Sequence, residues 1–188
     1  MTIESHPLPP FLPENATILF LGSFPPPRAR WSMEFFYPNW INDFWRIQGL
    51  IHFSDRTYFE KKDGSKSFDR EKIVAFCRKA GYAFYDTAAR VLRRKDNASD
   101  NFLEILEPAD ICALLQKLPL CHTVVTTGGK ASEELASILG MTEVPAPSEY
   151  YDVRICSREV RWYRMPSTSR AYPLSIEKKK EAYMKLVK

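Results

Sequence analysis

Histidine is scarce in this 188-residue chain, and its cysteines are widely spread. Three histidines are present, and none stands in a metal-ligand pattern. The four cysteines (Cys77, Cys112, Cys121 and Cys156) are separated by 34, 8 and 34 residues, unlike the close pairs of zinc knuckles and iron-sulfur loops. We therefore expect buried, reduced thiols, no metal and no cofactor.

Long apolar runs are also missing. The longest, residues 18–27, is about ten residues and is interrupted by glycine and proline, whereas a membrane span needs roughly 20. Residues 1–10 contain no basic segment followed by an apolar core, so no secretory signal is visible. We expect a cytoplasmic protein that does not enter a membrane.

The composition is typical of a globular protein, with 45% hydrophobic and 27% charged residues. The length leaves no room for a second full domain, so residues 1–188 are expected to form one domain. Basic residues gather at the C-terminal end, where residues 151–188 hold ten Lys/Arg against four acidic residues. This excess favours binding of a polyanion, although lysines 178–180 also fit a solvated helix face.

Strand and helix patterns alternate along the chain. The proline-rich residues 6–13 predict an extended arm, and the apolar residues 17–22 predict a strand buried on both faces. Further strands are expected at residues 82–86, 123–127, 153–156 and 160–165, and helices at 39–51, 69–79, 108–118, 130–139 and 175–187. This alternation indicates a parallel sheet covered by helices.

Two loops should leave the carboxyl edge of that sheet, where ligands bind in open α/β folds. The first is the sequence GSFP, in which a glycine allows close backbone approach to a ligand. The second carries Ser167, Thr168, Ser169 and Arg170, whose hydroxyls and positive charge suit a phosphate. A plain turn is the alternative for this serine-rich stretch.

Aromatic and amide side chains cluster between these two loops. The rings at residues 35–37 precede a proline in an expected loop, where an exposed ring would stack on a nucleic-acid base, whereas those at residues 44–45 fit a core helix face. Asn39 and Asn42 stand at the expected start of the helix. Either asparagine is a helix cap or a neutral amide that orients a water molecule.

Seven segments in order carry a resemblance to a known family. They are HPLPP (6–10), ILFLGSFPP (18–26), FFYPNWINDFW (35–45), GYAFYD (81–86), ASDN (98–101), VVTTGGKA (124–131) and MPSTS (165–169). Together they resemble the uracil-DNA glycosylase superfamily, and within it the DNA-deoxyinosine (hypoxanthine) glycosylases and their mismatch-specific uracil relatives.

The resemblance implies a three-layer α/β/α fold with a central, mostly parallel sheet. It also implies a monofunctional DNA N-glycosylase of base-excision repair, which hydrolyses the N-glycosidic bond of uracil or hypoxanthine flipped out of DNA. DNA would be the partner, and we expect a monomer. The alternatives are a catalytically impaired nucleic-acid-binding relative and an N-glycosidase that acts on nucleosides or RNA.

The matching motifs also imply roles for individual residues. Gly22, Ser23 and Phe24 would form the wall of a base pocket, with Phe35 as the stacking ring and Asn42 positioning the water. The loop at the end of the last strand would grip phosphates and enter the minor groove. Its residues are Ser167, Thr168, Ser169 and Arg170.

Four departures from the family pattern affect these assignments. Tyr37 precedes Pro38 where a histidine is common, and the spacing to Asn42 is two residues longer, so Asn39 competes for the catalytic role. The carboxyl group of Asp43 is either a base or a solvated surface acid.

The remaining two departures concern the base pocket. Thr127 stands where the base-recognising asparagine usually ends the third strand, which leaves the choice between uracil and hypoxanthine open. Met165 replaces the second-motif histidine, so no imidazole is expected to polarise the leaving base.

Overall fold

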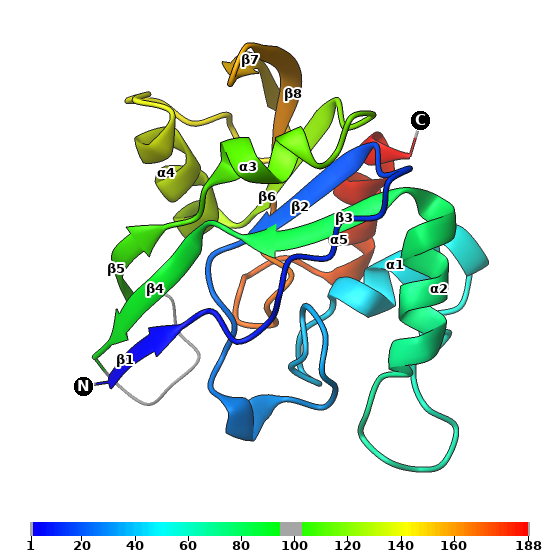
Figure 1. Ribbon diagram of the computed structural model, residues 1–188. Coiled ribbons are helices and arrows are strands. Elements are labelled where there is room, and N and C mark those ends of the chain that lie inside the picture. The colour runs from blue at the N-terminus through cyan, green and yellow to red at the C-terminus, as the bar shows by residue number, and fades with distance from the viewer. Residues whose placement is uncertain (1, 95–102, 188) are drawn as a thin grey trace.

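A five-stranded sheet forms the centre of the computed structural model, which describes residues 2–94 and 103–187 (Figure 1). Its strands lie in the order β3-β2-β6-β8-β7, and all neighbours are parallel except β7 and β8. Their bounds are Ile18–Gly22 (β2), Tyr82–Asp86 (β3), Thr123–Thr127 (β6), Tyr150–Ile155 (β7) and Arg158–Met165 (β8). The sheet is therefore mostly parallel, as expected.

Helices cover both faces of this sheet. Their bounds are Phe44–Phe53 (α1), Arg70–Ala80 (α2), Ile111–Gln116 (α3), Gly129–Ile138 (α4) and Ile176–Tyr183 (α5). Alternate side chains of β2 point to opposite layers, since Phe20 packs with α1, α2 and α5 whereas Leu19 and Leu21 pack with α3 and α4. The three-layer α/β/α prediction is confirmed. No helix within the described residues has the length and apolar character to span a membrane.

A second, antiparallel sheet was not predicted from the sequence. It consists of β1 (Thr2–Ser5), β4 (Ala88–Arg93) and β5 (Leu103–Pro108), with β4 in the middle. These strands are short and rich in charged residues, so the sequence shows no hydrophobic alternation that would predict them. Two of them are joined by an ion pair, in which the Arg93 guanidinium donates to the Glu4 carboxylate at 2.6 Å. The ASDN segment lies outside the described residues.

The N-terminal arm is extended, as its prolines predicted, and it follows the outer edge of β3 (Figure 1). Phe11 pairs with Phe84 through two backbone hydrogen bonds of 3.0 and 2.9 Å. This pairing covers the free edge of the central sheet. It also leads the chain past the end of β3, where the arm places the His6 side chain against Asp86.

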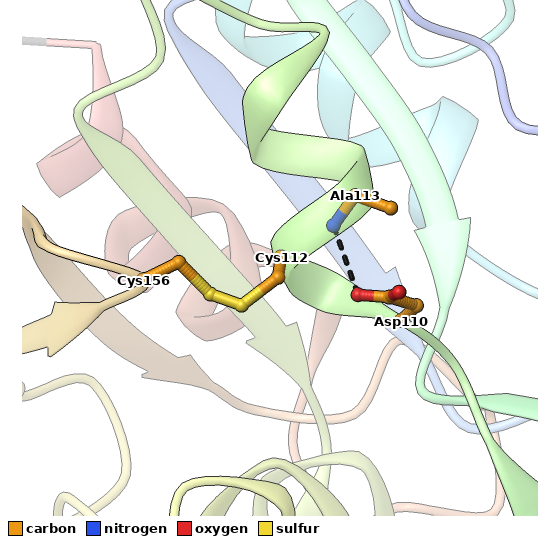
Figure 2. Close-up of a disulfide and its surroundings, with 4 residues drawn as sticks. All are labelled: Asp110, Cys112, Ala113 and Cys156. Atoms are coloured by element: carbon orange, nitrogen blue, oxygen red, sulfur yellow. Dashed lines mark hydrogen bonds between the residues drawn. A yellow bond between two sulfur atoms is a disulfide. The ribbon is translucent and has the colours of Figure 1, made fainter.

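Two helix starts differ from the sequence-based boundaries. The helix expected from residue 39 begins at Phe44, so Asn39 and Asn42 lie in the loop before it. The helix expected from residue 108 begins at Ile111, because Pro108 ends β5 and the Asp110 carboxylate caps α3 by accepting from the Ala113 amide at 2.9 Å (Figure 2).

The expectation of four reduced cysteines is wrong for one pair. Cys112 on α3 and Cys156 in the β7–β8 turn form a disulfide, with their Cα atoms 5.7 Å apart and a sequence separation of 44 (Figure 2). Sequence spacing alone does not show that these two elements meet. Cys77 and Cys121 are free and buried, as expected. The cytoplasmic location stays a prediction, and disulfides are uncommon in that compartment.

Candidate active site

A cavity of about 600 Å³ opens where the parallel strands end. It lies beside Gly22 of β2, Asp86 of β3 and Thr127 of β6, and the loop after β8 completes its wall. A larger cavity of about 940 Å³ lies at the opposite edge, beside the first residues of β2, β3 and β6. Because ligands of open α/β sheets bind beyond the carboxyl ends of the strands, the smaller cavity is the candidate site.

Most of the residues suggested by the sequence do meet at this cavity. Its lining includes Gly22, Ser23, Phe24, Asn39, Asn42, Thr127, Ser167, Thr168, Ser169 and Arg170. The lining residues outside that set include Phe36, Tyr37, Asp86 and Tyr172. Phe35 and Asp43 are not part of the lining.

Gly22 occupies a position that leaves no space for a side chain. A Cβ atom there would overlap the Asp86 carboxylate oxygen Oδ1. The Gly22 carbonyl accepts a 2.9 Å hydrogen bond from the Thr87 amide, which holds the two strand ends together. Glycine thus lets the Asp86 carboxylate lie directly against the main chain at the cavity wall.

Tyr37 contributes a hydroxyl group to the cavity. Its backbone has a positive φ of 52°, which is uncommon for a bulky residue and often marks functional positions. Its ring stacks on Phe44 with centroids 3.9 Å apart, and its hydroxyl lies 2.8 Å from Thr127 Oγ1. Burial raises the pKa of the Tyr37 phenol far above its usual value, and the nearby Asp86 charge adds to this, so the hydroxyl keeps its proton.

Asp86 is a site residue that the sequence analysis missed. Its Oδ2 atom accepts a 2.8 Å hydrogen bond from Nε2 of His6, whose ring packs against Tyr85 and Phe24 with centroids 4.5 and 5.4 Å away. The available signal was positional, because Asp86 ends β3 in register with Gly22 of β2. Parallel neighbours that end together place their last side chains at the same edge.

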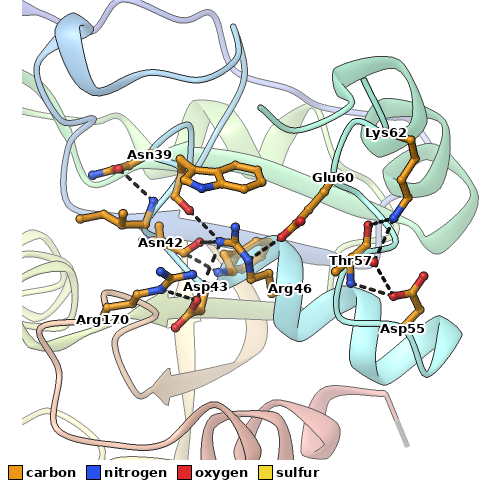
Figure 3. A network of polar contacts seen from close by, with 12 residues as sticks. Asn39, Asn42, Asp43, Arg46, Asp55, Thr57, Glu60, Lys62 and Arg170 are labelled. Carbon is orange, nitrogen blue, oxygen red and sulfur yellow. Dashed lines mark hydrogen bonds and ion pairs between the residues drawn. The ribbon is translucent and has the colours of Figure 1, made fainter. Parts of the chain in front are cut away.

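The two candidate asparagines both lie in the loop before α1, where the Asn42 backbone amide donates to the Asn39 backbone carbonyl at 2.9 Å (Figure 3). Asn42 Oδ1 accepts from the Phe44 amide at 2.9 Å, and Asn39 Oδ1 accepts from the Ile41 amide at 3.2 Å. These bonds fix the orientation of both amides. Each Oδ1 keeps a second lone pair and each NH₂ keeps its donors, so either side chain can still hold a water molecule.

Asp43 is not a solvated surface acid, and it lies outside the cavity lining, so its role as a base stays a prediction. It is 5% exposed, and its carboxylate accepts from Arg170 Nε at 2.9 Å (Figure 3). Arg46 and Lys179 lie 3.9 and 4.0 Å from the same carboxylate. The solvated-surface interpretation is corrected, since Asp43 is the buried anion that joins three cationic side chains.

The serine-rich loop after β8 is anchored to the segment that carries Asn42. Asn42 and Ser169 form an antiparallel bridge, and the Asp43 amide donates to the Thr168 carbonyl at 3.0 Å. Within the loop, Ser167 Oγ accepts from the Ser169 amide at 3.2 Å. The predicted phosphate loop and the predicted water-positioning segment are therefore one connected unit.

The expectation of an exposed stacking ring at Phe35 is wrong. Phe35 is only 5% exposed and packs against Phe11, Phe84 and Trp45 in the core. Three aromatic residues border the cavity in addition to Tyr37, namely Phe24, Phe36 and Tyr172.

Positive charge at the cavity comes from Arg30 and Arg170, both exposed. Elsewhere in the C-terminal basic segment, Arg154, Arg161 and Lys185 pair with the acidic residues Glu159, Asp152 and Glu149. Those pairs reduce the charge available for a polyanion away from the cavity. Within the described residues, no group of three or more His, Cys, Asp and Glu side chains is placed to hold a metal ion.

Fold and cavity together define a three-layer α/β/α protein with a candidate ligand site at the carboxyl edge of its sheet. Among solved structures, the chain is similar to the solution NMR structure of "a putative Uracil DNA glycosylase" from Methanosarcina acetivorans, with a TM-score of 0.63 and 22% sequence identity. The match covers 99% of both chains. No protein-family model and no curated protein matches the sequence. At this identity the similarity establishes the fold.

Proposed function

We propose that this protein is a monofunctional DNA glycosylase of base-excision repair, which removes a deaminated base, uracil or hypoxanthine, from DNA. One observation carries the proposal. Asn42, Gly22 and the Ser167–Arg170 loop, which stand far apart in the sequence, line one cavity at the carboxyl edge of the sheet. The solved structure with the same fold is named "a putative Uracil DNA glycosylase", which agrees with this chemistry.

DNA binding would begin at the rim of the cavity. Arg30 and Arg170 are exposed cations there, and Ser167 and Ser169 add hydroxyl groups suited to phosphate oxygens. A base inside the duplex cannot reach the cavity, so the target nucleotide must rotate out of the stack. Unstacking costs a few kcal/mol and least for a mispaired or damaged base, which favours lesions before any contact to the base forms.

Hydrolysis would use water as the nucleophile. The water oxygen bonds to C1′ of the sugar, the bond from C1′ to the base nitrogen breaks, and its electron pair leaves with the base. The proton that the water loses passes to solvent or to the departing base. The described lining residues include no lysine, so the cavity offers no amine for a covalent sugar intermediate.

Asn42 would hold the attacking water through its amide. A neutral amide orients water without taking its proton, which suits a reaction whose transition state already carries positive charge on the sugar. Asn39 lines the same cavity and is the competing position for this role.

The proposal is tested by single-turnover cleavage of matched oligonucleotides that contain uracil, hypoxanthine, xanthine or only normal bases, single-stranded and duplex. Alkali converts abasic sites to strand breaks. We expect breaks at uracil or hypoxanthine and none in undamaged DNA. Asn42→Ala should slow the reaction by about 100-fold or more with little loss of binding.

The control Asn15→Ala removes an exposed amide that donates to the Arg78 carbonyl, away from the cavity, and should leave the rate unchanged. Normal turnover by Asn42→Ala would transfer the role to Asn39. Tight binding to lesions without any breaks would instead identify a catalytically impaired relative. Cleavage of free nucleosides with no salt dependence would identify a nucleoside N-glycosidase.

A further inference from the structure

Asp86 and Tyr37 place an acceptor and a donor next to each other on the cavity wall. The Asp86 carboxylate oxygen Oδ1 lies against Gly22, and the Tyr37 hydroxyl lies 3.8 Å from the point where a Gly22 side chain would begin. Both residues line the cavity. The two polar groups are therefore neighbours on one short stretch of wall.

His6 determines which Asp86 oxygen remains for a ligand. Because a carboxylate oxygen only accepts, Nε2 of His6 donates to Oδ2 at 2.8 Å. On the other side of the ring, Nδ1 lies beside the Leu8 backbone, 2.8 Å from its carbonyl oxygen and 3.2 Å from its amide nitrogen. A neutral ring protonated at Nε2 accepts from that amide, which holds the imidazole in place. Oδ2 is thus occupied from behind, and Oδ1 is left to accept a hydrogen bond from the cavity side.

Thr127 has a matching effect on Tyr37. The Tyr37 and Thr127 hydroxyls are 2.8 Å apart, and either can be the donor. The single Thr127 hydroxyl proton can go to the Leu21 carbonyl at 3.5 Å or to the nearer Tyr37 oxygen at 2.8 Å. When Thr127 donates to the Tyr37 oxygen, the phenol proton is directed to a ligand. The ring cannot turn away, since it stacks on Phe44 with an interplanar angle of 5°. The phenol also keeps its proton, because burial raises the pKa of Tyr37 well above physiological pH.

We propose that Asp86 and Tyr37 recognise the lactam edge of the flipped base, with Asp86 accepting from the ring N–H and Tyr37 donating to the adjacent carbonyl oxygen. This inference rests on the proposed glycosylase function and specifies its substrate class. Deamination of adenine or cytosine replaces a ring-nitrogen acceptor with N–H and an amino donor with a carbonyl. The Asp86 acceptor and the Tyr37 donor complement the N–H and the carbonyl of the deaminated base. In the parent base, Asp86 would face a ring-nitrogen acceptor and Tyr37 would face an amino donor.

Guanine and thymine carry the same lactam edge. The pair therefore separates hypoxanthine from adenine and uracil from cytosine, and other parts of the cavity wall must exclude the two normal lactam bases. A mismatch of one polar pair in a water-poor site costs about 1–3 kcal/mol, which corresponds to roughly 5- to 150-fold in rate or affinity.

The decisive variant is Asp86→Asn, because an asparagine side chain has nearly the same shape as an aspartate side chain. His6 would bond to the amide oxygen in place of Oδ2, so the amide NH₂ would face the cavity where Oδ1 stood. The acceptor would thus become a donor. Affinity and single-turnover rate are measured on duplexes that carry hypoxanthine or adenine at one mismatched position, and on a second set with uracil or cytosine.

We expect wild-type protein to prefer the deaminated member of each set by at least 10-fold. Asp86→Asn should weaken binding of the deaminated base and tighten binding of the amino base, which general damage to the site would not do. Tyr37→Phe should weaken only the deaminated base. Asp63→Asn, in an exposed loop away from the cavity, is the matched control and should behave as wild type.

The result that overturns the inference is an Asp86→Asn variant that cleaves lesions with the wild-type preference between the two bases. Failure of the proposed glycosylase function would give a different experimental result. In that case wild-type protein forms no abasic sites, and the inference survives if the binding preference is present and Asp86→Asn reverses it. Wild-type protein with neither cleavage nor preference would refute both.

Discussion

At Gly22 the cavity wall is so closely packed that one added methyl group should disable it. In Gly22→Ala the new Cβ would collide with Asp86 Oδ1, and either the carboxylate or the strand end must move. Displacement of a recognition group by about 1 Å costs on the order of 100-fold in rate. We expect this loss in single-turnover cleavage, with a thermal midpoint close to that of wild type.

Gly129→Ala is the matched control for this substitution. Its Cβ would meet nothing closer than 3.6 Å, and the residue lies at the start of α4 outside the cavity lining. Replacement of a helical glycine by alanine should preserve activity and slightly stabilise the protein. If Gly22→Ala keeps full activity, the close contact with Asp86 does not shape the site.

The predicted placement of residues at the cavity agrees with the structure where position in the chain decides and disagrees where side-chain direction decides. The predicted placement of Gly22 and Thr127 at the cavity follows from their position as the last residues of buried parallel strands. Among three consecutive rings, the sequence does not show that Phe35 turns into the core while Phe36 and Tyr37 border the cavity. Asp86 also ends a parallel strand, in register with Gly22, but it was missed because a single acidic residue belongs to no recognisable motif.

Helix α5 supports the candidate site through a buried lysine. Lys179 is 1% exposed, which corrects the view of residues 178–180 as a wholly solvated face. Its ammonium donates to the Ser169 carbonyl at 2.8 Å and lies 4.0 Å from the Asp43 carboxylate. The lysine therefore ties the helix to the serine-rich loop and to the start of α1.

Lys179→Met should loosen that loop. A buried hydrogen bond from a charged group contributes about 1.5–3 kcal/mol, so the free energy of unfolding should fall by that amount. DNA affinity should fall as well, because the loop loses its anchor to α5. Chemical denaturation and equilibrium binding to a lesion duplex measure the two effects.

The neighbouring Lys178→Met tests whether the effect is specific to burial. Lys178 is exposed, so its substitution should change stability by less than about 0.5 kcal/mol. Equal stability of the two variants would show that Lys179 contributes nothing as an anchor.

Elements with strong periodicity or clear end signals were predictable. Strand β2 is an apolar run, and α2 has both a capping aspartate and a terminal glycine, so their positions agree within a few residues. The small antiparallel sheet was not predictable, because strands such as β5 carry charged residues without alternation. The start of α1 was misplaced because Ile41 continues the helical period although it lies in the loop.

At the scale of the whole molecule, the alternation of strands and helices predicted the layers but not the covalent link between them. The order β3-β2-β6-β8-β7 places α3 and the β7–β8 turn on neighbouring parts of the surface. Only this arrangement brings Cys112 to Cys156. A sequence with four scattered cysteines has several possible pairings and also the fully reduced state, so the disulfide required the fold.

The disulfide should make the stability of this protein depend on redox conditions. A cross-link that closes a loop of this length contributes about 2–4 kcal/mol, largely by restricting the unfolded chain. For a protein of this size, reduction should lower the thermal midpoint by roughly 5–15 °C. Wild-type protein under reducing conditions and a Cys112→Ser/Cys156→Ser variant under oxidising conditions should show the same midpoint, because both lack the same link.

Thiol titration independently counts the free cysteines. Burial raises the pKa of Cys121 to about 11 and that of Cys77 further, so neither free thiol should react in the folded state. Two thiols should react after denaturation without reductant and four after reduction, whereas four without reductant would show that Cys112 and Cys156 are not bonded.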